Sequence, residues 1–144
     1  MIDLNREWPG NENGPTAPSR HAGILFNRLL KPNADYAIDF HTSTTGIDMA
    51  ALHIARMDSP EVRAMAELFP IDQIFDNPAY PGILANAFID AGIPAFTPEI
   101  GAPRVLDPDM ITLFVEGTMN VLKHHGIIAG PMGRTGKDTG TFCR

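Results

Sequence analysis

The chain has little cysteine and no long hydrophobic run. Its single cysteine, Cys143, is next to last among 144 residues, so an internal disulfide is excluded and we expect an intracellular, cytoplasmic protein. No apolar run is long enough to cross a membrane, and the polar opening with Asp3, Glu7 and Glu12 does not match a signal peptide. We therefore expect no membrane partner.

Positive charge is also scarce. The chain has 11 lysines and arginines against 17 aspartates and glutamates, which gives a formal net charge of −6. Non-specific nucleic-acid binding depends on basic residues that neutralise phosphates, so this balance argues against a nucleic-acid partner. Hydrophobic residues make up 44% of the chain, which is enough for the core of one domain and excludes disorder over the whole length.

Turn-forming residues, in contrast, are abundant. The chain has 13 prolines and 13 glycines, which favours alternating short elements over a helical bundle. Alternating apolar residues and buried runs predict strands over residues 34–41, 50–57, 71–75 and 93–100. Caps and helical periodicity predict helices over residues 20–31, 59–69, 83–91 and 108–125. Ser19 and Ser59 are the expected caps of the first two helices, and the whole pattern predicts an α/β sheet with helices on its faces.

Three short segments carry the candidate chemistry. In an open α/β sheet, functional groups gather at strand ends and in the loops that follow them. The opening loop holds Asn5 and Arg6, which offer adjacent amide and guanidinium donors for a carboxylate. The alternative is a solvated arginine beside an asparagine that serves the turn.

The other two segments lie at strand ends. His41 follows an apolar strand, and Asp39 on the same side of that strand would orient its imidazole as a metal ligand. The alternative is a hydrogen-bonded structural histidine. Glu99 stands in an apolar strand, where burial raises the pKa of a glutamate and suits it to act as a general base. The alternative is a structural glutamate paired with Arg104 or another cation.

Taken together and in this order, the segments resemble the zinc amidohydrolases that include succinylglutamate desuccinylase and aspartoacylase, which are related in fold to zinc carboxypeptidases. Residues 3–10 resemble the substrate-clamp segment of that family, residues 38–42 its strand with the second zinc histidine, and residues 92–101 its catalytic-glutamate strand. The resemblance extends over residues 2–125. It implies a three-layer α/β/α fold with a mixed, mostly parallel, zinc-peptidase-like sheet, present here incompletely.

The resemblance also implies roles for four residues. His41 would be a zinc ligand, and Asn5 and Arg6 would hold a carboxylate of the substrate. Glu99 would be the general base and then the proton donor to the leaving amine. The implied activity is that of a zinc-dependent deacylase, a hydrolase of the amide bond in N-acyl amino acids. Zinc serves such a reaction because it polarises the carbonyl and lowers the pKa of bound water.

The chain departs from the family pattern in two places. The family takes two further zinc ligands from an earlier HisGlyxxGlu segment, which this chain lacks, and residues 83–90 lack the expected substrate-binding arginine. We therefore expect a partial catalytic domain over residues 1–128, followed by residues 129–144 as a Gly-rich tail or the start of a C-terminal region. The chain is then either a fragment of an enzyme, which we favour, or a degenerate member, and we expect little hydrolysis from it.

Two other functions stay open. A carboxypeptidase-like metallopeptidase would use the same fold on larger substrates. A non-catalytic module would bind carboxylated ligands through Asn5 and Arg6 alone. A sheet that lacks its first strand would expose an edge, which favours self-association and makes a homo-oligomer one expected state.

Overall fold

The structure is a computed structural model that describes residues 2–76 and 80–139. Its backbone forms two compact units, each made of two stretches of sequence. The first unit comprises Met1–Asp39 and Pro78–Phe96, and the second comprises Phe40–Asn77 and Thr97–Arg144. Strand β5 (Ala95–Ile100) contributes its first two residues to the first unit and the other four to the second.

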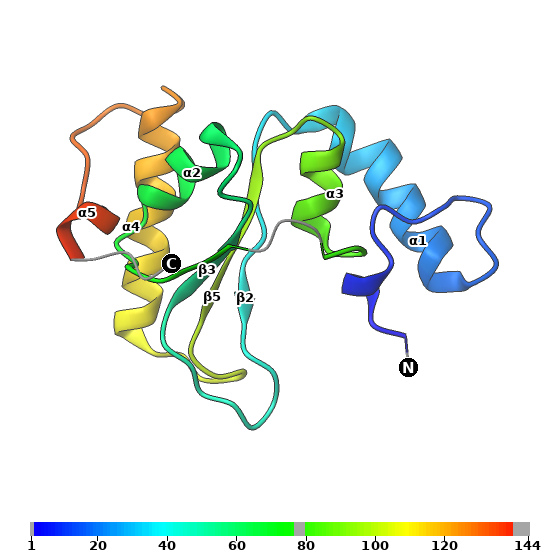
Figure 1. Ribbon diagram of the computed structural model, residues 1–144, viewed down its shortest axis with the longest axis horizontal. Helices are drawn as coiled ribbons and strands as arrows, with labels where there is room; N and C mark the ends of the chain where they lie inside the picture. The colour runs from blue at the N-terminus through cyan, green and yellow to red at the C-terminus, as the bar shows by residue number, and fades with distance from the viewer. Residues whose placement is uncertain (1, 77–79, 140–144) are drawn as a thin grey trace. The chain divides into compact units, whose positions relative to one another are not determined.

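The first unit is mostly helical (Figure 1). Its strand β1 runs parallel to the start of β5, with Ala37 opposite Ala95 and Ile38 opposite Phe96. Besides β1 (Ala37–Ile38), the unit contains the 3-10 turn η1 (Leu4–Arg6), helix α1 (Ala17–Leu25), the π turn η2 (Phe26–Leu30), the 3-10 turn η3 (Lys31–Asn33) and helix α3 (Leu84–Asp90).

The start of helix α1 corrects one prediction. Thr16 caps this helix, and the N–H of Ser19 donates to the Thr16 hydroxyl at 3.2 Å, so the expected Ser19 cap is wrong. The helix begins early because Pro18 lies in its first turn, where the N–H that proline lacks would have no helical partner. The core of this unit joins α1–η2 to α3, and the rings of Phe26 and Phe88 lie 5.3 Å apart.

The second unit contains the rest of the sheet. Strand β3 (Leu52–Ala55) lies between β4 (Ile74–Asp76), to which it runs parallel, and β5, to which it runs antiparallel. Strand β2 (His41–Thr42) runs parallel to the other edge of β5. The helices are α2 (Pro60–Glu67), α4 (Pro108–His124) and α5 (Gly136–Thr139). Ser59 caps α2 as predicted, because its side chain accepts from the N–H of Val62.

Phe69 fills the core of the second unit. It is fully buried, and its ring centroid lies 5.2 Å from that of His53 and 6.4 Å from that of Phe114, with the rings nearly perpendicular in both pairs. Gly117 of α4 lies directly against this ring, since a Cβ there would approach Phe69 Cδ1 to 2.1 Å. Helix α4 therefore covers the face of the sheet that carries His53.

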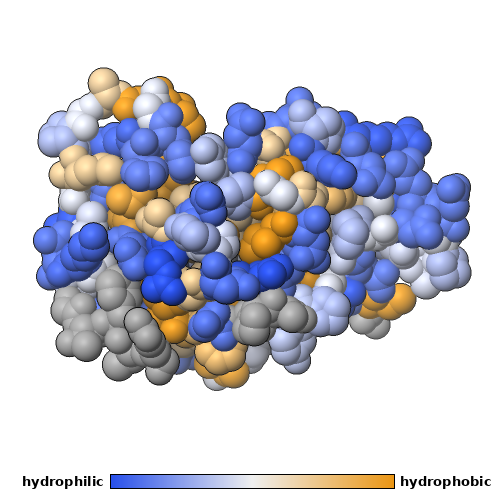
Figure 2. Space-filling view, turned by 45° about the horizontal axis from the view of Figure 1, so that its top comes forward, coloured by the Kyte–Doolittle hydropathy of each residue, from blue (hydrophilic) through white to orange (hydrophobic). Residues whose placement is uncertain are grey.

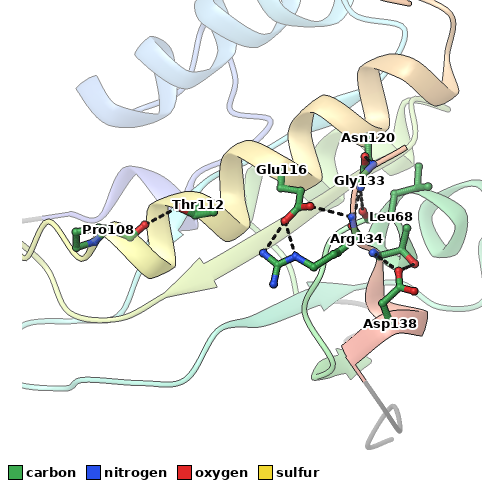
Figure 3. A network of polar contacts seen from close by, with 9 residues as sticks. Leu68, Pro108, Thr112, Glu116, Asn120, Gly133, Arg134 and Asp138 are labelled. Carbon is green, nitrogen blue, oxygen red and sulfur yellow. Dashed lines mark hydrogen bonds and ion pairs between the residues drawn. The ribbon is translucent and has the colours of Figure 1, made fainter. Parts of the chain in front are cut away.

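The segment before α5 folds back along helix α4 (Figure 3). The buried Asn120 side chain donates to the carbonyls of Leu68 and Arg134 and accepts from the N–H of Gly133. The Arg134 guanidinium donates to Glu116 at 2.7 Å. The Asn120 amide thus links the end of α2, helix α4 and residues 133–134. The expected boundary at residue 128 stays a prediction.

The predicted α/β class is confirmed. Three of the four strand pairings are parallel and one is antiparallel, so the sheet is mixed and mostly parallel, as the resemblance implied.

Hydrophobic residues are visible at the surface among hydrophilic ones (Figure 2). Within the described residues, no helix combines the length and the apolar character that crossing a membrane requires.

Candidate functional site

His41 and Glu99 occupy neighbouring positions on two parallel strands. The strand pairing places His41 of β2 opposite Glu99 of β5, and Leu52 of β3 opposite Glu99 on the other side. Directly opposed residues project from the same face of a sheet with Cβ atoms about 5 Å apart. The imidazole, the carboxylate and an apolar side chain therefore form one row across three strands.

This row lies on the sheet face opposite helix α4. Phe40 precedes His41 and packs against Phe114 of α4, with ring centroids 5.0 Å apart. Because side chains alternate along a strand, His41 projects away from α4. Pro98 is paired with the buried His53 on the α4 side, so Glu99 likewise projects from the opposite face. His41 and Glu99 are both half-buried there.

A buried hydroxyl ties together the two loops that follow these strands. The Ser43 hydroxyl lies 2.7 Å from the carbonyl oxygen of Gly101, and its other close neighbour is the carbonyl of Ile47. The N–H of Gly101 donates to the carbonyl of Met49. Sequence reasoning did not single out Ser43. Its only sequence signal is a small hydroxyl residue just past the strand end.

The predicted carboxylate-binding pair lies in the first unit. Asn5 and Arg6 belong to the turn η1, where the side chain of Asp3 accepts from the N–H of Asn5 at 2.9 Å. The Asn5 side-chain oxygen in turn accepts from the N–H of Leu84, the first residue of α3, at 3.1 Å. This contact gives Asn5 a structural role, because the first N–H groups of a helix have no partner inside it.

Arg6 is exposed next to this contact. Its Nη1 donates to the carbonyl of Asn5 at 2.6 Å and lies 3.8 Å from a carboxylate oxygen of Asp3. The turn is held in place by Gly82, whose missing side chain lets the backbone of Arg6 approach, because a Cβ there would lie 2.3 Å from the Arg6 carbonyl oxygen. An exposed guanidinium on a fixed backbone is suited to a carboxylate ligand.

The structure thus brings two of the four predicted site residues side by side, His41 with Glu99, and places the pair Asn5–Arg6 in the other unit. A catalytic zinc normally has three protein ligands. Residues 2–76 and 80–139 contain no group of three histidine, cysteine, aspartate or glutamate side chains placed to hold a metal ion. The described residues therefore do not fit a complete zinc site on their own.

A family model and several solved structures match this chain over most of its length. The family model described as the succinylglutamate desuccinylase/aspartoacylase catalytic domain matches residues 2–125. The ectoine utilization protein EutE (DoeB) from Ruegeria pomeroyi is 27% identical with a TM-score of 0.76, over 91% of this chain and 43% of that one. The succinylglutamate desuccinylase/aspartoacylase from Rhodobacter sphaeroides is 27% identical with a TM-score of 0.72, over 91% and 39%.

A third structure agrees with these two. A succinylglutamate desuccinylase from Silicibacter sp. TM1040 is 27% identical with a TM-score of 0.74, over 90% of this chain and 41% of that one. The chain thus spans about two fifths of the length of these solved structures. No curated protein matches it.

Proposed function

Because the chain belongs to the succinylglutamate desuccinylase/aspartoacylase family, we propose that it acts in the hydrolysis of the amide bond of N-acyl amino acids. The family model covers most of the chain, so the resemblance seen in its three segments is confirmed at the level of the family. One observation supports the chemistry above all. The pairing of β2 with β5 sets a potential metal ligand, His41, beside a potential base, Glu99.

Glu99 would handle the protons of this reaction. Its carboxylate would take a proton from the water whose oxygen attacks the amide carbon, and would pass it to the nitrogen when the carbon–nitrogen bond breaks. The second proton of the water also ends on the nitrogen, so the products are a carboxylate and a protonated amine, and atoms and protons balance.

His41 would supply one ligand to a zinc ion. A neutral imidazole is a common zinc ligand, and His41 projects from the sheet face that carries Glu99. Further protein ligands would have to come from outside the described residues, since these hold no group of three suitable side chains.

Asn5 and Arg6 would recognise the substrate through its carboxylate. The guanidinium of Arg6 is the cation of the pair, and a two-pronged hydrogen bond to a carboxylate both attracts and orients an acyl amino acid. The Asn5 side-chain oxygen, which accepts from the N–H of Leu84, fixes the turn that presents Arg6.

A non-catalytic carboxylate-binding module is the second candidate. The absence of a three-ligand metal group among the described residues favours it, because ligand binding through Arg6 needs no metal. Release of amine that depends on added zinc, even at a low rate, would exclude the module. A module would bind N-acyl amino acids and release them unchanged, whatever metal is added.

Calorimetric titration of the chain with N-succinyl-glutamate tests the proposed substrate class. We expect Arg6→Gln to weaken binding at least about tenfold, because a charge-assisted hydrogen bond to the ligand is lost. Arg63→Gln, which alters an exposed arginine of the second unit, is the matched control and should leave binding unchanged. Equal affinity of the Arg6→Gln variant and the unaltered chain would refute the assignment of Arg6.

A further inference from the structure

Thr97 carries a buried hydroxyl that the described chain leaves unsatisfied. The residue is 3% exposed, and its Oγ1 has no hydrogen-bond partner among residues 2–76 and 80–139. Its neighbour on β3 is Ile54, whose side chain has no polar atom. Buried hydroxyls in folded proteins almost always have a partner, which is often an ordered water. The position of Thr97 therefore indicates a polar group that binds there.

The direction of the side chain shows where that group lies. Thr97 precedes Glu99 by two residues on β5, so both side chains project from the face opposite helix α4. Residues two apart on a strand have Cα atoms about 6.7 Å apart. That separation suits a single water that bridges a hydroxyl and a carboxylate, and a buried water needs at least two such polar partners.

We propose that Thr97 is a positioning residue, whose hydroxyl holds one ordered water against the Glu99 carboxylate and so fixes that carboxylate beside His41. The proposal rests on the proposed function only for the catalytic role of Glu99. The physical link between Thr97 and Glu99 concerns the fold alone. It can be measured on the chain without any turnover, so it fails or stands independently of the proposed activity.

Thermal unfolding of single and double variants measures this link. Thr97→Val keeps the shape of the side chain and removes the hydroxyl, and Glu99→Leu removes the carboxylate. We expect Thr97→Val to lower the melting temperature by about 4 °C in the unaltered chain and by less than about 1 °C in the Glu99→Leu background. The difference between the two shifts reports the coupling.

Thr97→Ser is the control for the hydroxyl itself, because it changes the shape of the side chain and keeps the group that would hold the water. This variant keeps the hydroxyl, so Glu99→Leu should lower the melting temperature as much in its presence as in the unaltered chain. Ile54→Val, which trims the neighbour of Thr97, should show no coupling to Glu99→Leu. An unchanged or higher melting temperature for Thr97→Val would overturn the proposal, because an orphaned hydroxyl is better replaced by a methyl group. Equal shifts in both backgrounds would overturn it as well.

Discussion

His53 is a basic side chain in an apolar core. It is fully buried on β3, where its neighbours on the adjoining strands are Ile74 and Pro98 and its ring meets Phe69. Burial lowers the pKa of its imidazole from 6.5 to about 3, because the charged form is disfavoured away from water. The folded protein therefore keeps a neutral ring there, on the face of the sheet turned away from Glu99.

His53 should make the free energy of unfolding depend on pH. The unfolded chain binds a proton at His53 below about pH 6.5 and the folded chain does not, so the stability that the neutral ring contributes is complete above that pH and is lost towards pH 3. We expect the free energy of unfolding, measured with urea, to fall by about 2 kcal/mol between pH 7 and pH 5 through His53.

The comparison with His53→Leu isolates this contribution. His125, whose pKa is also lowered by burial, acts in the same direction, and its smaller effect should persist in the variant. An equally steep pH dependence in His53→Leu and in the unaltered chain would show that His53 is not the group responsible.

At the scale of elements, helix α4 shows that apolar periodicity does not always mark the buried face. Ile111, Val115 and Met119 recur every four residues, yet they are 42%, 57% and 40% exposed. The helix buries Gly117 and Val121 instead, and with them the polar Asn120. Glycine brings the helix backbone against the Phe69 ring, and a hydrophobic pattern gives no signal for a contact made without a side chain.

Gly117→Ala should destabilise the protein by about 2 kcal/mol. Alanine favours a helix over glycine by about 1 kcal/mol, but the new methyl group would overlap three atoms of the fully buried Phe69 ring, and overpacking of that kind costs more. The urea midpoint measures the change. Val115→Ala, on the exposed side of the same helix, should alter stability by less than about 0.5 kcal/mol. A higher midpoint for Gly117→Ala would mean that helix propensity outweighs the contact.

Elements with local signals were predictable from the sequence. Ser59 before Pro60 gave the start of α2. Gly92 and Gly126, both at positive φ, follow the ends of α3 and α4, as is typical of glycine at helix C-termini. The predicted strand over 34–41 is instead two short strands, β1 and β2, each paired with a different part of β5. Its division depends on pairing with a distant segment, which local sequence does not encode.

The candidate site was likewise predictable only where local sequence carries the signal. The order of the three segments was enough to identify the family, and strand ends identified His41 and Glu99 as candidates. Neither the Ser43 link to Gly101 nor the unsatisfied Thr97 hydroxyl could be predicted, because each depends on which backbone carbonyls or side chains approach across strands. That Arg6 acts on the same substrate as His41 and Glu99, as the resemblance implies, stays a prediction.

At the scale of the whole molecule, the chain matches about two fifths of each solved relative. The described residues bring the predicted base and one predicted metal ligand together on β5 and β2. They bring no third donor to that pair that would complete a metal group. Under the proposed function, turnover would depend on the metal affinity of the whole chain.

We expect the chain by itself to bind zinc weakly and to release little amine from N-succinyl-glutamate. A single imidazole does not replace the three protein ligands of a catalytic zinc, so a chromophoric chelator should compete successfully for the metal. His41→Ala should reduce the residual binding, and a variant with both His124 and His125 changed to Gln serves as the control for the adjacent histidine pair. Stoichiometric binding that resists the chelator would contradict this expectation.

The opposite orientations of Phe40 and His41 have a consequence for how this gene can change. Phe40 faces helix α4 and His41 faces Glu99, so the loss or gain of one codon just before β2 would exchange their sides. The phenyl ring would then stand beside the carboxylate, and the imidazole would be pressed onto an apolar helix. The number of residues before β2 therefore determines which of the two side chains stands beside Glu99.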